Sequence, residues 1–185
     1  HLLIDLDGHE KSVLSEMGEL KKLLEGLTAR DLKTAVGEAA CEELWDLRRD
    51  FSLALKATGL IKLNEDVAVP RGRLVALVEF CEQLSKKYGY PIACFGHAGD
   101  GNIHVNLMAA DYHTNKAVYR KVQKALDELF KQVIAWDGVI TGEHGIGIAK
   151  QRWWNRATSP VSREVHAQLK SALDPNGILN PGKFV

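Results

Sequence analysis

The sequence predicts an α+β fold in which helices pack on one face of a mainly antiparallel sheet. Residues 38–57 and 73–89 carry apolar side chains at helical spacing. IKLNEDVAVP, at 61–70, alternates between apolar and polar residues and ends in proline, as strands often do. CFGHAGDGNIHVNL, at 94–107, holds an Asp-Gly pair between alternating residues, which is the strongest short-range signal of a hairpin. Helices that alternate with strands, one hairpin included, favour this class and leave the other sheet face free.

The N-terminal part is expected to add two short strands and one more helix. LLIDLDG, at 2–8, is an apolar run with alternating acids, and TAVG, at 34–37, is a weaker strand candidate. Between them, a helix is predicted from about Ser12 to Leu24, with Gly26 as its stop signal. The helix over 38–57 should bury the stripe Leu44, Leu47, Phe51, Ala54 and Leu55.

The C-terminal part is expected to contain two further helices, separated by a short strand. The helix over 73–89 should end at Gly89, and another is predicted over 113–136. GVITGEHGIG, at 138–147, then predicts a short strand that runs into a glycine-rich turn. Ser159-Pro160 should cap a last helix that ends near Leu173, before the tail ILNPGKF. We find no repeat or linker, so one domain over 1–185 is the simplest prediction.

The hairpin is expected to bring two histidines together. A two-residue turn at Asp100-Gly101 would pair His97 directly with His104, with their Cβ atoms about 4.5–5.5 Å apart. Because strand side chains alternate, one face would carry polar residues and the other would be core. The polar face comprises Phe95, His97, Asn102, His104 and Asn106, and the core face comprises Cys94, Ala98, Ile103, Val105 and Leu107. Such a His pair suits a divalent metal, although the hairpin alone favours a surface or hydrogen-bonded pair of histidines.

Composition excludes several classes of protein. Lys plus Arg equals Asp plus Glu at 24 each, so there is no basic excess of the kind that nucleic-acid-binding proteins carry. Cys41, Cys81 and Cys94 are odd in number and form no CxxC pair, which favours neither disulfides nor a thiolate metal site and fits the cytoplasm. No apolar run approaches the roughly 18 residues that would span a membrane, so we expect a soluble protein without nucleic-acid partners.

A second polar cluster lies in GVITGEHGIG, where Glu143 and His144 stand side by side among glycines. Glu143 would complete a metal site of two histidines and one carboxylate, which leaves His144 as a general base. The alternative is a loop in which Glu143 only caps backbone amides.

GHAGDGNIHVN, GEHGIG and LDPNGILNPGKF, in this order, resemble the C-terminal domain of FAD-linked oxidases such as the glycolate oxidase flavin subunit, D-lactate dehydrogenase and D-2-hydroxyglutarate dehydrogenase. LWDLRRDFSLALKATGLIKLNEDVAVP is similar to the family's Trp-x-x-Arg helix and the strand that follows it. The resemblance covers essentially the whole chain. It implies a ferredoxin-like α+β sheet that roofs the flavin, and oxidation of a small 2-hydroxy acid to a 2-oxo acid with hydride transfer to FAD.

The resemblance also implies roles for individual residues. His97, His104 and Glu143 match metal ligands, with zinc expected and manganese or iron as alternatives, and His144 matches the base. The substrate-binding positions that it implies are Arg48, Ser52, Lys62 and Asn106, and Asn180 matches a tail residue near the flavin.

In relatives, an FAD-binding domain with a glycine-rich pyrophosphate loop precedes this domain, and no such loop occurs here. Together with a start inside an apparent strand, this predicts a C-terminal fragment whose main partner is the FAD-binding domain of the same chain. A homodimer is expected for the full-length enzyme, with an unidentified electron acceptor that could place it at the inner membrane.

Two other classes of function stay open on the residues alone. A metal-dependent hydrolase could use the same two histidines and glutamate around a bound water. A non-catalytic interaction domain could present the polar sheet face to a partner.

Overall fold

The computed structural model describes residues 1–27 and 29–183, which form two compact units. The first unit is His1–Leu55, and the second begins at Lys56. Phe184, in the predicted tail, lies outside the described residues. No helix in the described ranges is long and apolar enough to cross a membrane.

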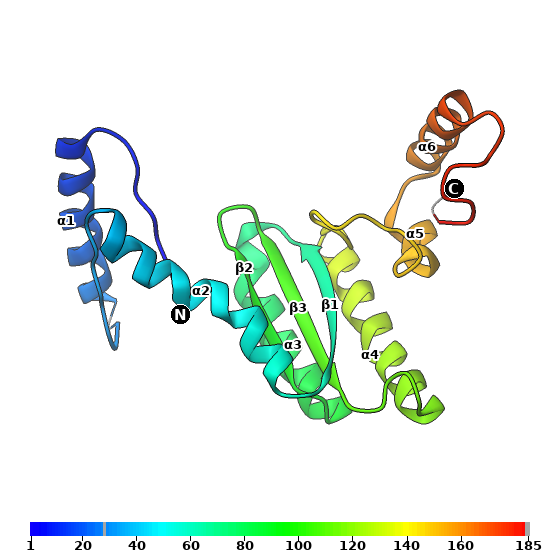
Figure 1. Ribbon diagram of the computed structural model, residues 1–185, viewed down its shortest axis with the longest axis horizontal. Helices are drawn as coiled ribbons and strands as arrows, with labels where there is room; N and C mark the ends of the chain where they lie inside the picture. The colour runs from blue at the N-terminus through cyan, green and yellow to red at the C-terminus, as the bar shows by residue number, and fades with distance from the viewer. Residues whose placement is uncertain (28, 184–185) are drawn as a thin grey trace. The chain divides into compact units, whose positions relative to one another are not determined.

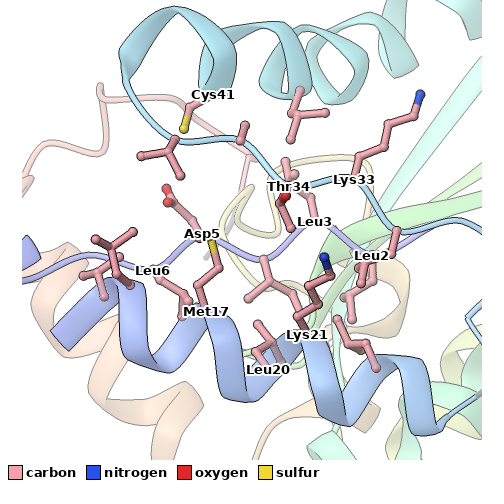
Figure 2. A pocket seen from close by; sticks show the side chains of 18 of the residues that line it. Leu2, Leu3, Asp5, Leu6, Met17, Leu20, Lys21, Lys33, Thr34 and Cys41 are labelled. Atoms are coloured by element: carbon pink, nitrogen blue, oxygen red, sulfur yellow. The ribbon is translucent and has the colours of Figure 1, made fainter. Parts of the chain in front are cut away.

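The first unit contains the helix α1 (Glu10–Gly26) and nearly all of α2 (Glu38–Ala57), which confirms both predicted helices. The predicted strands at 2–8 and 34–37 are wrong, because neither segment pairs with another strand. Their apolar side chains instead line a cavity of about 250 Å³ together with residues of both helices (Figure 2). No residue of α1 or α2 is buried, so the expected buried stripe of α2 is also wrong.

The second unit is built on a three-stranded antiparallel sheet with the strand order β1-β3-β2. Its elements follow the sequence prediction closely, with the addition of the short helix α5. They are β1 (Ile61–Ala68), η1 (Arg71–Arg73), α3 (Leu74–Tyr88), β2 (Ile92–His97), β3 (Asn102–Ala109), α4 (Lys116–Ala135), α5 (Gln151–Ala157) and α6 (Pro160–Leu173).

Local sequence signals explain where these helices begin and end. Gly89 adopts the left-handed conformation (φ 70°) that ends α3. The side chain of Asn115 accepts hydrogen bonds from two backbone amides at the start of α4, and Ser159 accepts one from Ser162 at the start of α6. Pro160 occupies the first turn of α6, where its missing N–H costs nothing.

The helices α3 and α4 pack on one face of the sheet and enclose the core (Figure 1). Val67, Val105 and Leu107 supply the sheet side of this core. The helices supply Leu77, Cys81, Leu84, Val122, Ala125, Leu126, Leu129, Phe130 and Val133. This arrangement confirms the α+β class with helices on one face.

The segment after α4 adds to the edge of β1 through one bridge, between Ala68 and Val139. The short strand predicted at the start of 138–147 is therefore reduced to this single residue pair. The order of elements, β1-α3-β2-β3-α4 followed by this bridge, is consistent with a ferredoxin-like arrangement whose fourth strand is reduced to one residue pair.

The hairpin has a different register from the predicted one. His97 pairs with Asn102 and Phe95 pairs with His104, so residues 98–101 form a four-residue loop. The amide of Val69 donates to the carbonyl of Gly101 at 3.0 Å, which ties Gly101 to the end of β1 and makes β3 begin at Asn102. The slip is two residues, and an even slip leaves the side chains that remain in the strands on their predicted faces. Ala98, predicted on the core face, lies instead in the loop and is exposed.

Candidate functional site

The polar face of the sheet carries a row of polar side chains that are mostly buried. Asp66 and Asn106 are fully buried, and Asn102 and His104 are 8% and 6% exposed. All eight residues of β3 are buried, so the expectation of a free face is wrong at the central strand. Buried polar groups are normally hydrogen-bonded, and a row of them indicates a site rather than a core.

His104, Glu143 and His144 form the most compact group of ligand atoms among the described residues, all within 4.8 Å of one another. Nε2 of His104 lies 3.2 Å from Oε1 of Glu143, and Nε2 of His144 lies 3.7 Å from the same oxygen. The rings of His104 and His144 stack with their centroids 5.3 Å apart. Residues far apart in the sequence thus present two imidazoles and a carboxylate to one point.

His97 lies next to this group but outside it. Because of the two-residue register shift, His97 is diagonal to His104 across the hairpin, and the two ring centroids are 6.3 Å apart. His97 is exposed, whereas His104 is buried. The ring of His144, the predicted base, therefore lies closer to the ring of His104 than the ring of His97, a predicted ligand, does.

Four buried side-chain atoms in the described residues have no hydrogen-bond partner: Oδ1 of Asn64, Asn102 and Asn106, and Nδ1 of His104. All four belong to the polar face of β1 and β3. Unpaired buried polar atoms cost about 1–3 kcal/mol each, so natural proteins retain them mainly where a ligand, water or ion satisfies them.

Burial lowers the pKa of His104, against the opposing effect of the nearby charges of Glu143 and Asp66. The neutral ring that results is the form in which histidine binds metals. The chemistry of the donor set, imidazole nitrogen and carboxylate oxygen, fits zinc, and manganese and iron accept the same ligands.

The predicted substrate-binding residues divide between the two units. Arg48 and Ser52 lie one turn apart on α2, in the first unit. Lys62 and Asn106 lie in the second unit on the polar face of the sheet, and Nδ2 of Asn106 donates to the carbonyls of Ala93 and His104. This leaves Oδ1 of Asn106 as the atom that can still accept a hydrogen bond.

Asn180 follows α6 in a left-handed conformation (φ 48°), which asparagine tolerates better than most residues. Asp174 shapes this tail, since its carboxylate accepts hydrogen bonds from the amides of Ile178 and Leu179 at 2.9 Å each. The ammonium group of Lys170 donates to both Asp174 and the carbonyl of Leu179.

Asp66 and Lys150 were missed from the sequence. Both are buried and charged. Asp66 contacts the segment that carries Glu143 and His144, and Lys150 contacts β1, the strand beneath that segment. The signal for Asp66 was its place on the polar face of an alternating strand, but Lys150 sits in a loop with no local pattern.

Comparison with known proteins identifies the family of this chain. The sequence pattern of the family described as FAD linked oxidases, C-terminal domain, matches residues 1–184. The chain is 34% identical over 183 residues to the glycolate oxidase subunit GlcD of Bacillus subtilis, covering 99% of the chain and 38% of that protein. It is 28% identical to the D-lactate dehydrogenase of Anaerostipes hadrus, covering 100% of the chain and 39% of the relative.

A third relative is the D-2-hydroxyglutarate dehydrogenase of Stutzerimonas stutzeri, with 32% identity over 150 residues, 80% of the chain and 32% of the relative. The chain thus spans less than two fifths of the length of these relatives. The match over nearly every residue confirms the family resemblance that the three motifs suggested, and the chain belongs to the family of FAD linked oxidases, C-terminal domain.

Proposed function

We propose that this chain is the substrate- and metal-binding part of a flavin-dependent dehydrogenase or oxidase that converts a small 2-hydroxy acid to a 2-oxo acid. The support is the cluster of His104, Glu143 and His144 on the polar sheet face, in a chain that belongs to this family. The relatives are named for glycolate, D-lactate and D-2-hydroxyglutarate, three acids that carry a hydroxyl next to a carboxylate, and these names support this substrate class.

The chemistry needs both a hydride acceptor and a proton acceptor, because the hydroxyl-bearing carbon loses a hydride and its oxygen loses a proton. Flavin, held by the FAD-binding domain of the full-length enzyme, supplies the hydride acceptor. His144 takes the proton, because its side chain is 41% exposed and so can reach a bound hydroxyl.

Arg48 holds the substrate carboxylate, since a guanidinium forms two parallel hydrogen bonds to a carboxylate. Ser52, Lys62 and Asn106 hold the remaining oxygens, and Oδ1 of Asn106 is suited to accept a hydrogen bond from the substrate hydroxyl. Asn180, in the tail, would lie near the flavin.

His104 and Glu143 hold a divalent metal, with zinc first and manganese or iron as alternatives. Such an ion supplies Lewis acidity to the substrate oxygens. His97 is the third ligand in this assignment, which leaves His144 as the base. A second assignment, with His144 as the ligand, is favoured by the compactness of the group His104, Glu143 and His144.

Three substitutions in the full-length enzyme separate these assignments, with zinc content and kcat measured for each. His144→Asn should lower kcat by about 10² to 10⁴ and leave the zinc content unchanged, because a base is lost and no ligand. Glu143→Gln should lower the zinc content, and added zinc should partly restore kcat by mass action. His97→Ala should also lower the zinc content while the fold remains intact, because its side chain is exposed.

His113→Ala serves as the matched control, since it removes an exposed imidazole that belongs to none of these motifs. If excess zinc rescues His144→Asn and not His97→Ala, His144 is the ligand and the second assignment holds. Absence of 2-oxo acid formation from any of a panel of D- and L-2-hydroxy acids, with zinc-dependent ester or amide hydrolysis instead, would replace the oxidation by the hydrolase alternative.

A cytoplasmic location, a homodimer and an electron acceptor near the inner membrane remain predictions for the full-length enzyme. Light scattering on the purified enzyme tests the homodimer directly.

A further inference from the structure

Asp66 is a fully buried carboxylate on the polar face of β1, directly opposite His104 in the strand register. Its two oxygens accept five hydrogen bonds. Oδ1 accepts one from Nδ2 of Asn102 at 2.6 Å. Oδ2 accepts four, from Oγ1 of Thr141 at 3.1 Å and from the backbone amides of Gly142 at 2.8 Å, Glu143 at 2.7 Å and His144 at 2.8 Å.

The three amides belong to consecutive residues that lie in neither a helix nor a strand. Their N–H groups therefore lack the partners that regular structure would supply, and one buried carboxylate oxygen satisfies all three. Burial alone would raise the pKa of Asp66, but hydrogen bonds from the His144 amide, the Asn102 side chain and the Glu143 amide lower it well below its usual range. Five donors face the two oxygens of Asp66, an arrangement that fits the ionised carboxylate, whose hydrogen bonds to the loop are of the stronger, charge-assisted kind.

The loop from Val139 to Lys150 is tied to β1 on both sides of these hydrogen bonds. Before them, Val139 and Ala68 exchange two backbone hydrogen bonds of 2.8 and 3.0 Å. After them, Nζ of the buried Lys150 donates to the main-chain oxygen of Asp66 at 2.8 Å. Ile140 and Ile146 are also buried, so the backbone around residues 141–144 is anchored while the Glu143 and His144 side chains stay exposed.

Gly142 shows how closely the loop lies on Asp66. A Cβ atom at this position would meet Nδ2 of Asn102 at 1.9 Å and Oδ1 of Asp66 at 2.8 Å. Any side chain at residue 142 must therefore separate the loop from the Asp66–Asn102 pair, by displacing one or the other.

We infer that Asp66 is the positioning residue of the site: it sets the backbone of 142–144 so that the Glu143 carboxylate meets His104 and the His144 ring stacks on it. The expected effect of Asp66 on kcat rests on the proposed function, whereas its expected effect on the backbone of 142–144 does not. The carboxylate touches no substrate atom, and it acts through the two neighbours that carry the metal-binding and proton-accepting groups.

Asp66→Asn is the sharpest test, because the variant keeps the shape and one acceptor oxygen. The substitution introduces an NH₂ group that needs an acceptor. Oδ1 of Asn102 is buried without a partner, and rotation of the Asn102 amide lets it accept this hydrogen bond. We therefore expect the fold to be preserved. Only the charge on the loop hydrogen bonds is lost. In the full-length enzyme, we expect amide exchange within 139–150, measured by hydrogen-exchange mass spectrometry, to become about tenfold faster, with little change elsewhere.

The kinetic and metal readouts should follow the loop. Loss of support around ligands typically costs about 10–100-fold in metal affinity or activity, so zinc affinity and kcat should each fall within that range. KM should change much less than kcat, because Arg48, on α2, is untouched. Asp111→Asn is the matched control, since it makes the same chemical change at an exposed turn with positive φ, where asparagine is well tolerated.

Gly142→Ala tests the same idea with Asp66 intact. If the docking of the loop on Asp66 positions the site, this variant should speed exchange within 139–150 and reduce zinc affinity as Asp66→Asn does. Gly72→Ala is its control, because a Cβ there meets nothing within 4 Å and its φ needs no glycine.

The outcomes distinguish this inference from the proposed function. Unchanged exchange within 139–150 in Asp66→Asn, or unchanged zinc affinity and kcat despite faster exchange, would overturn the positioning role while leaving hydroxy acid oxidation in place. Faster exchange together with weaker zinc binding supports it, even if the wild-type enzyme oxidises no 2-hydroxy acid.

Discussion

Lys150 and Glu65 form a buried ion pair beneath the candidate site, and replacing Lys150 with methionine should destabilise the fold strongly. The side chains of Lys150 and Glu65 are 4% and 11% exposed, and Nζ of Lys150 lies 4.0 Å from Oε2 of Glu65. Methionine keeps most of the length and the apolar stem of lysine. It removes the charge opposite Glu65 and the donor to the main-chain oxygen of Asp66.

The magnitude follows from the distance and the burial. At 4.0 Å and an effective dielectric constant of about 20, the attraction is about 4 kcal/mol. Removing one partner of a buried pair costs about 3–5 kcal/mol, because the other charge stays buried alone. We therefore expect Lys150→Met to lose about 3–5 kcal/mol, and the double variant Lys150→Met with Glu65→Gln to recover part of that loss. The coupling free energy should be about 2–4 kcal/mol.

Urea unfolding of the wild type, both single variants and the double variant measures this coupling. Trp153 is buried against Phe130, with ring centroids 4.4 Å apart, so its fluorescence reports on this part of the core. A coupling below about 0.5 kcal/mol would show that the pair is not an energetic unit and would refute the reasoning.

The pH dependence of the Lys150→Met variant provides a second check. Burial raises the pKa of Glu65 above its ordinary 4.5, and Lys150 opposes that shift. Without Lys150 the pKa of Glu65 should rise further, so the folded state holds this proton to higher pH than the unfolded state does. The stabilising contribution of this proton is then fully present below pH 4.5 and is lost as the pH rises through the raised pKa. A shift from about pH 7 toward about pH 5 should therefore restore stability in this variant relative to the wild type.

Three further predictions concern single positions. Arg48→Lys in the full-length enzyme should raise KM about tenfold or more, because an ammonium cannot form the two parallel hydrogen bonds of a guanidinium; an unchanged KM removes Arg48 from the site. Gly101→Ala should cost at least about 1–3 kcal/mol, since its φ is +73° and a Cβ would meet the Val69 oxygen at 2.1 Å, and equal melting temperatures for this variant and Gly99→Ala would contradict that. Asp174→Asn should speed amide exchange in 178–183 at about pH 7. The hydrogen bond from Lys170 lowers the pKa of Asp174, so Asp174 should hold the tail of the wild type until the pH falls below 3.8. A change in the amide exchange of the wild-type tail near neutral pH would contradict this role of Asp174.

Local patterns were sufficient for most helices of the chain. The stretch 38–57 is helical as predicted, and Ser159-Pro160 marks the start of α6 because a capping side chain and a fixed proline φ act within one turn. The predicted strands at 2–8 and 34–37 failed for the opposite reason. A strand needs a partner elsewhere in the chain, and its own residues do not reveal whether one is available.

The residues that share the polar face could be identified without a structure, because side-chain alternation survives any even shift in register. The family could be identified in the same way, from three motifs with specific spacing. The folded chain was needed to show that His97 lies diagonal to His104 and that the ring of His144 stacks on the ring of His104. It was also needed to place Asp66 under the amides of 142–144 and Lys150 against Glu65. The contacts of Asp66 with this loop join residues 75 to 84 positions apart. Their geometry depends on how β1 and the loop pack together, which no local pattern encodes.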